Sequence, residues 1–374
     1  MAVGALDPTR ASTPASTRAG PPAPADSAGL DRARRLTAGP LAIATGTLLG
    51  AALAGILAGA ISLPPLGIVE ELLDRLPFVS IDSGLTERQA TILWELRLPR
   101  VVLGGLVGAT LAMSGAAYQG VFRNPLADPY LLGVAAGAGL GATLALAYLP
   151  GATDWPVDPL PMAAFVGGLV GVVLTYALGR SGSQIRSTAT LILAGVAVAA
   201  FLTAIQTFVQ QRHSDTLREV YAWILGTLGT VGWREVALIL GYVVVGGIVL
   251  LLHRRLLDVM ALGDEEADSL GIRAGRVRIV VVVAATLATA GAVAVSGLIG
   301  FVGIIVPHTV RLVFGTSYRL VLPLSVLFGA AFLILADLLA RTLAAPAEVP
   351  IGVVTAFVGA PFFLLVLRRA RRVS

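Results

Sequence analysis

The chain has 374 residues, of which 56% are hydrophobic and only 13% are charged, and its formal net charge is +5. Soluble domains carry charges on about a quarter of their residues, so this composition excludes a water-soluble protein and predicts an integral membrane protein. All 27 basic residues are Arg. A P-loop needs a Lys to reach nucleotide phosphates, so the chain lacks the standard ATP-hydrolysing motif, and any ATP must be hydrolysed by a partner.

Residues 1–35 are rich in Ala, Pro, Ser, Thr and Gly and lack an apolar period. This composition predicts a disordered cytoplasmic tail. A cleaved signal peptide is not expected, because the apolar run that follows is long enough to span a membrane. Residues 36–374 then form a single membrane domain.

Continuous apolar runs of about 20 residues predict an all-α fold of transmembrane helices, since a barrel would alternate apolar and polar residues. Ten spans are expected, at about 36–62, 99–120, 131–150, 160–179, 191–210, 235–252, 279–297, 298–315, 320–341 and 349–367. An even number puts both termini on one side. Most Arg residues lie on that side, which predicts cytoplasmic termini.

The boundary between spans seven and eight, residues 296–300, is hardly polar. A tight Gly turn buried in protein is expected there. Ser114-Gly115 before Pro125 and Ser296-Gly297 before Pro307 have equal spacing and lie five spans apart. They suggest an inverted repeat of spans 2–5 and 7–10, although chance matches are common in a chain rich in Gly and Ala.

The inner turn, residues 123–129, follows span two. Pro125 and Pro129 fix its backbone, while Asn124 and Asp128 can accept hydrogen bonds from local amides. A rigid turn beside a pore can act as a gate, and the alternative is a plain helix connector.

The central loop, residues 256–272, is an acidic segment between two clusters of Arg, which places it in the cytoplasm. Gly263 and Gly271 each follow what is predicted to be a short helical piece, because Gly commonly ends a helix. Two short helices would present a docking surface. An ordinary solvated loop is the alternative.

On the opposite side, Arg97 and Arg100 lie at the mouth of span two and Arg341 lies near the end of span nine. They could pair with carboxylates of a docking protein, or only extend to the membrane interface. Asp337 is the one clear acid within a span. Arg341 follows it at i+4, so a local ion pair is expected.

No clustered nucleophile, base or metal-ligand set supports an enzyme, and no cofactor is expected. His213, His253 and His308 lack a helical ligand spacing and are interpreted as non-catalytic. A stand-alone secondary transporter would be expected to have more intramembrane charge.

Many ordered motifs resemble the FecCD family of ABC importer permeases, over about residues 36–370. They are Leu96-Arg97-Leu98-Pro99-Arg100, Ser114-Gly115, Gln119-Gly120, Asn124-Pro125-Leu126-Ala127-Asp128-Pro129, Leu132-Gly133, Leu193-Ala194-Gly195-Val196, Trp223-Ile224-Leu225-Gly226, Ala261-Leu262-Gly263, Ser269-Leu270-Gly271, Gly300-Phe301-Val302-Gly303, Val306-Pro307-His308, Ala336-Asp337 and Pro350-Ile351-Gly352.

The resemblance implies a multi-pass permease of the cell membrane that is not itself an enzyme. Two copies would form the pore, two ABC ATPase subunits would dock beneath it, and a substrate-binding protein would dock outside. Membrane lipid is the remaining partner, and no nucleic acid is expected. A ferric siderophore is the expected substrate, with cobalamin or haem as the alternative.

The resemblance also assigns roles to individual positions. The ATPase would contact the central loop through Gly263, Asp264, Glu265, Ala267, Leu270 and Gly271. The cytoplasmic gate would include Asn124, Leu126 and Thr188. The binding protein would be met by Arg97, Arg100 and Arg341.

Overall fold

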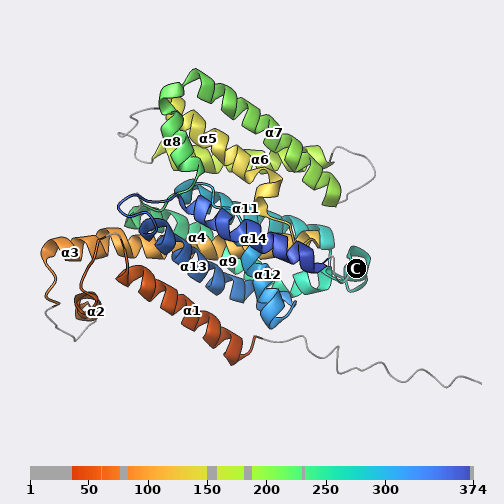
Figure 1. Cartoon of the computed structure of the whole chain (residues 1–374). Helices are drawn as coiled ribbons and strands as arrows, with labels where there is room; N and C mark the ends of the chain where they lie inside the picture. Colours follow the sequence, from red (N-terminus) through yellow and green to blue (C-terminus); the bar gives the residue numbers. More distant parts are fainter. Residues whose placement is uncertain are drawn as a thin grey trace, which may run out of the picture.

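The computed structural model describes residues 36–59, 61–75, 83–149, 158–180, 188–229 and 232–370, and these residues are helical with no strand among them (Figure 1). Within this described part, seven helices are long and apolar enough to cross a membrane. They are α1 (Ala38–Leu57), α4 (Leu98–Phe122) together with α3 (Glu87–Thr91) and the π-helix η2 (Ile92–Arg97) that run into it, α6 (Pro159–Arg180), α7 (Thr188–Arg212), α9 (Trp233–Met260), α11 (Ala274–Ser296) and α13 (Tyr318–Thr342).

Three shorter apolar helices occupy the remaining predicted spans. They are α5 (Val134–Tyr148), α12 (Val302–Phe314) and α14 (Ile351–Ala370). Each predicted apolar run therefore contains a helix, while the number of complete crossings stays a prediction. Short helices complete the described chain: α2 (Pro65–Asp74), η3 (Pro129–Leu132), η4 (Ser214–Thr216), α8 (Leu217–Ile224) and α10 (Asp264–Ser269).

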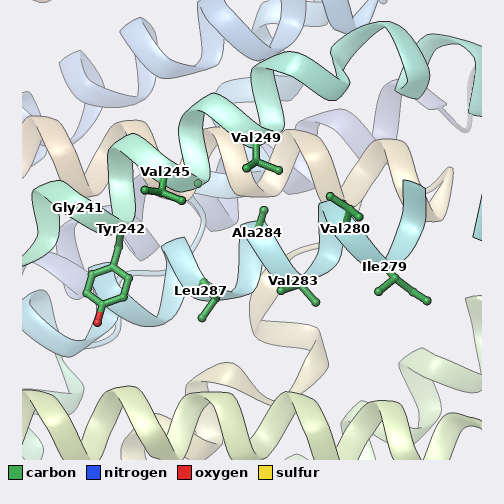
Figure 2. A pocket seen from close by; sticks show the side chains of 10 residues that line it. Gly241, Tyr242, Val245, Val249, Ile279, Val280, Val283, Ala284 and Leu287 are labelled. Carbon is green, nitrogen blue, oxygen red and sulfur yellow. The ribbon is translucent and has the colours of Figure 1, made fainter. Parts of the chain in front are cut away.

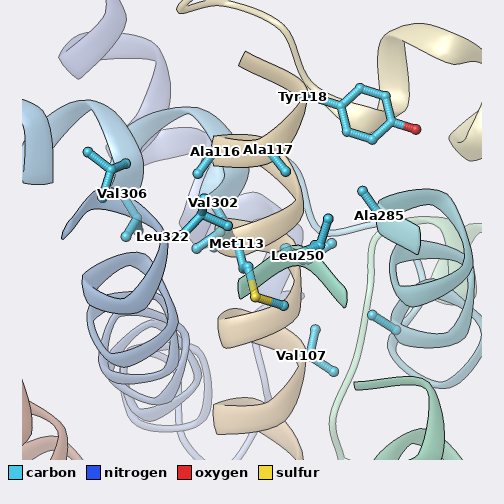
Figure 3. Packing of buried hydrophobic residues seen from close by; sticks show 14 of the residues in the cluster. Val107, Met113, Ala116, Ala117, Tyr118, Leu250, Ala285, Val302, Val306 and Leu322 are labelled. Carbon is cyan, nitrogen blue, oxygen red and sulfur yellow. The ribbon is translucent and has the colours of Figure 1, made fainter. Parts of the chain in front are cut away.

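Helix α4 is the centre of the molecule. In an apolar stretch of 18 residues of the α3–η2–α4 unit, 83% of the residues are buried. In the corresponding stretch of α1, only 17% are buried. Figure 3 shows Met113, Ala116 and Ala117 of α4 among side chains of α9, α11, α12 and α13, including Leu250 and Val302. Small residues let these helices approach closely, which is how helices associate in lipid, where no hydrophobic force drives them together.

Helices α5 to α8 form a second group, seen at the top of Figure 1. Within it α5 packs against α6 and α7, and the group joins the rest of the molecule mainly where α6 and α5 lie against α11. Helix α1 lies on the other side, against α13.

The boundary between α11 and α12 is a non-helical segment, residues 297–301, in which Gly297 and Ile299 are buried. Gly297 and Phe301 at its ends both have φ of 68°. Between them, the hydroxyl group of Tyr130 accepts a hydrogen bond from the Ile299 N–H and donates one to the Ile299 carbonyl, each at 3.1 Å. Non-helical backbone at membrane depth needs such partners, so Tyr130 explains how the segment is tolerated.

The two copies of the suspected repeat motif have different local structures. Ser114-Gly115 lies inside α4, whereas Ser296 is the last residue of α11 and Gly297 follows it. Pro125 lies in a turn, whereas Pro307 lies inside α12. These positions therefore give no support to an inverted repeat, which stays a prediction.

Candidate functional site

The inner turn begins where α4 ends, at Arg123 in the left-handed conformation with φ of 49°. The N–H groups of Arg123 and Asn124 donate to the carbonyls of Gly120 and Gln119, a pattern that closes the helix. The side chain of Asn124 then accepts from the Leu126 N–H at 2.9 Å, and that of Asp128 from the Tyr130 N–H at 2.8 Å. The predicted bonds from Asn124 and Asp128 to local amides are confirmed.

Leu126 and Asn124 are half-buried at this turn. The two side-chain bonds and the two prolines fix the backbone of the turn that carries Leu126. Thr188, the third predicted gate residue, begins α7, but its side chain lies outside the described part of the chain.

The central loop contains one separate short helix and not two. No helix breaker lies between His253 and Met260, so α9 continues to Met260 and includes the first expected piece. Gly263, with φ of 148°, turns the chain into α10, and Gly271, with φ of 78°, ends it. The N–H of Ile272 donates to the Ala267 carbonyl at 2.9 Å, which closes the end of α10.

The predicted ATPase-contact residues fall into two groups. Glu265, Leu270 and Gly271 are exposed, and Asp264 is half-exposed. Gly263 and Ala267 are buried, and the methyl group of Ala267 is 0% exposed. Ala267 therefore anchors α10 to the chain and does not offer its side chain to a partner.

Leu262 is an exposed position that the predicted set missed. Leu262 precedes α10 in the chain and is 67% exposed, and Leu270 directly follows α10 and is 63% exposed. Two leucines that flank an acidic helix form an apolar and charged surface on the loop, and exposed apolar groups beside polar ones are typical of a docking site.

The inner turn and the central loop are joined by Asp264. Its carboxylate lies 3.3 Å from Arg123 of the inner turn and 2.8 Å from Arg278 of α11. The side chains of Arg123 and Asp264 are 44% and 40% exposed, so this pair contributes only about 0–1 kcal/mol to stability. The pair connects α10 of the central loop with the inner turn.

The three outer Arg residues, Arg97, Arg100 and Arg341, form hydrogen bonds and ion pairs with other residues of the chain. Arg97 donates to the carbonyls of Ile56 and Leu57 at 2.9 and 3.2 Å and to Ile61 at 2.6 Å, and Arg341 donates to Gly55. These carbonyls lie at or just after the end of α1, where a helix leaves its last carbonyls without partners. Arg97 and Arg341 thus provide hydrogen-bond donors for the carbonyl groups at the end of α1.

Arg100 binds two carboxylates. It contacts Asp337 and Glu348, each at 2.8 Å, and Asp337 also lies 3.4 Å from Arg341. The local pair of Asp337 and Arg341 is therefore confirmed, and Arg100 is an additional partner. The hydrogen bond from Arg100 lowers the pKa of Glu348, which lies between α13 and α14.

All three of these Arg residues are largely buried. Arg97 and Arg341 are 5% and 4% exposed, and the side chain of Arg100 is 11% exposed. A buried guanidinium group that turns outward loses its partners. Breaking a buried ion pair in this way costs on the order of 3–5 kcal/mol of stability. The docking of a binding protein at Arg97, Arg100 and Arg341 stays a prediction.

The profile of the FecCD transport family matches residues 47–369. The chain belongs to the FecCD transport family. It is 44% identical over 77% of its length to the cobalamin import system permease protein BtuC of Halobacterium salinarum, covering 76% of that protein. It is also 38% identical over 81% of its length to the Fe(3+)-citrate import system permease protein YfmD of Bacillus subtilis, covering 88% of it.

A solved structure supports the fold. The inward-facing conformation of an ABC transporter of metal-chelate type matches this chain with a TM-score of 0.74 and 28% identity, covering 88% of this chain and 99% of that one. As a FecCD-family ABC importer permease, the chain is a multi-pass protein of the inner membrane.

Proposed function

We propose that two copies of this FecCD-family permease form the translocation pathway of an ATP-driven importer. The proposal includes ten spans with cytoplasmic termini, two ATPase subunits at the central loop and a substrate-binding protein on the outer face. Its main support is the contact of Asp264 with Arg123, at 3.3 Å, because this contact joins the segment available to an ATPase with the segment that would gate the pathway.

In this mechanism, an ATPase subunit binds α10 through Leu262, Glu265 and Leu270. Displacement of α10 moves Asp264, which bears on Arg123 and so on the inner turn. The turn is rigid, so it moves as a unit and carries Leu126 with it. When Leu126 residues of two copies meet, they form an apolar constriction that excludes water.

On the outer face, the three Arg residues stabilise the packing of the helices beneath the binding protein. Arg97 and Arg341 hold the end of α1, and Arg100 holds α4 against Asp337 and Glu348. The outer face is thereby kept in a fixed shape for the binding protein, and Glu348, whose side chain is 42% exposed, is the member of this cluster that reaches solvent.

The proposed substrate is a ferric siderophore, in line with an iron-chelate permease among the relatives. Cobalamin is the second candidate, because the relative with 44% identity is a cobalamin permease. Deleting the gene in its source organism should abolish uptake of an ⁵⁵Fe-loaded siderophore and leave uptake of ⁵⁷Co-labelled cobalamin unchanged. Loss of cobalamin uptake alone would overturn the siderophore assignment in favour of the second candidate.

The gate assignment predicts a leak. Replacing Leu126 with Ala should increase the release of a small dye from liposomes that contain the permease without its ATPase, because the apolar constriction would widen. A suitable control is Leu131→Ala, since Leu131 is 37% exposed in the neighbouring η3 and its truncation leaves no internal cavity. Leu132 is a poor control because it is only 3% exposed. Equal release from the parent, Leu126→Ala and Leu131→Ala proteins would show that the turn is only a connector.

A further inference from the structure

An apolar groove runs between α9 and α11, on a surface that the functional proposal does not use (Figure 2). Its volume is about 720 Å³. The groove is lined by Gly241, Tyr242, Val245 and Val249 of α9 and by residues of α11 that include Val283 and Leu287. Val245 and Val283 are 65% and 51% exposed, so the groove is open along its length and not a sealed cavity.

The two ends of the groove differ. At one end, the ring of Tyr242 packs against Phe165 of α6, with the two ring centres 5.0 Å apart. At the opposite end, Ile279 and Val280 are 45% and 41% exposed. A flexible hydrocarbon chain would therefore have its free end at Tyr242 and leave the groove past Ile279.

Basic residues continue the groove beyond its open end. Arg276 precedes Val280 by four residues, so helical periodicity places it on the stripe of α11 that lines the groove, and Arg273 is the residue immediately before this helix. His253 follows Val249 by four residues on the α9 side. Arg278, in contrast, lies on another face of α11, where it binds Asp264.

The side chains of Arg273 and Arg276 are exposed, and neither makes an ion pair or hydrogen bond within the part of the chain that the structure describes. Among the nearby acids, Asp264 pairs with Arg123 and Arg278, Asp258 accepts from the Ser317 hydroxyl group, and Asp268 accepts from the Ala274 N–H. Glu265 and Glu266 remain as exposed acids of α10.

We propose that the groove binds an anionic phospholipid of the inner leaflet, with one acyl chain between α9 and α11 and the phosphate at Arg273 and Arg276. The lining offers an acyl chain only apolar contacts, and the two guanidinium groups offer a phosphate the geometry that it prefers. The Arg-rich ends of α9 and α11 face the cytoplasm by the positive-inside tendency, and the inner leaflet is the one that carries anionic lipid.

Native mass spectrometry of the full-length chain, delipidated in detergent, would test this with dioleoyl phosphatidylglycerol and dioleoyl phosphatidylcholine as the two probes. Phosphatidylglycerol should bind about tenfold or more tightly than phosphatidylcholine, since each Arg near an anionic surface contributes roughly a fivefold gain. The double variant Arg273→Gln with Arg276→Gln should lose this preference. The matched pair Arg254→Gln with Arg255→Gln removes the same charge from other faces of α9 and should keep it.

A second arm tests the acyl-chain site. Gly241 lines the groove and a Cβ added there meets nothing within 4 Å, so Gly241→Leu should fill the groove without a clash and weaken binding of phosphatidylglycerol. Gly50 of α1 is equally open, and Gly50→Leu should leave lipid binding unchanged. Equal affinity for the two lipids, equal effects of the two Arg pairs, or undiminished binding in Gly241→Leu would each overturn the proposal. Melting temperatures close to that of the parent would show that all variants are folded.

Discussion

Replacing Gly263 or Gly271 with Val is expected to abolish substrate uptake while the protein still inserts into the membrane. The two residues have φ of 148° and 78°, and a β-branched side chain is strongly disfavoured in this region. At Gly263 an added Cβ would also run into the carboxylate of Glu266. The strain, on the order of 1–3 kcal/mol at each position, would displace α10 and with it Asp264.

Two controls separate the turn geometry from a general effect of larger side chains. Gly271→Asn should retain uptake, because Asn tolerates the left-handed conformation. Gly275→Val lies at the start of α11, where a Cβ meets nothing within 4 Å, and should also retain it. The measurements are uptake of labelled substrate and the amount of protein in the membrane fraction. Normal uptake in Gly263→Val and Gly271→Val would separate the central loop from coupling.

Replacing Asp337 with Ala is expected to lower the free energy of unfolding by about 3–5 kcal/mol, because it leaves buried guanidinium groups without their carboxylate. Asp337 is 2% exposed and contacts both Arg100 and Arg341. The resulting excess of positive charge would also weaken the hold of Arg341 on Gly55 at the end of α1.

Glu348→Ala provides the matched control, since it removes the other carboxylate that binds Arg100. Its side chain is 42% exposed, so its loss should cost less than about 1 kcal/mol. Unfolding of the purified protein in detergent, followed by heat or denaturant, would give both values. Equal losses in the two variants would contradict the assignment of Asp337 as the buried centre of this cluster.

The positions of the helices follow from the sequence because hydropathy reports them directly. The span expected at 99–120 is α4 at Leu98–Phe122, and the one expected at 320–341 is α13 at Tyr318–Thr342. The side-chain bonds of Asn124 and Asp128 were also predictable, because each reaches an amide only two residues away. Local geometry is sufficient for such bonds.

The burial of the outer Arg residues was not predictable in the same way. The partners of Arg97 lie 36 to 41 residues away, and those of Arg100 lie 237 and 248 residues away. One signal was present: the last turn of α1 has no basic residue, so its unpaired carbonyls needed donors from elsewhere. Likewise, the link from Asp264 to Arg123 depends on the packing of α4 beside α9 and α11, which no local pattern encodes.

The hydrogen bonds between Tyr130 and Ile299 also affect the order in which the molecule is made. Tyr130 leaves the ribosome 169 residues before its partner, an interval on the order of ten to thirty seconds at ordinary rates of synthesis. Until Ile299 has been made, the hydroxyl group of Tyr130 lacks the backbone to which it binds in the finished chain. The α5–α8 group therefore gains this attachment only after translation has passed α11, and a chain that ended before Ile299 would lack it.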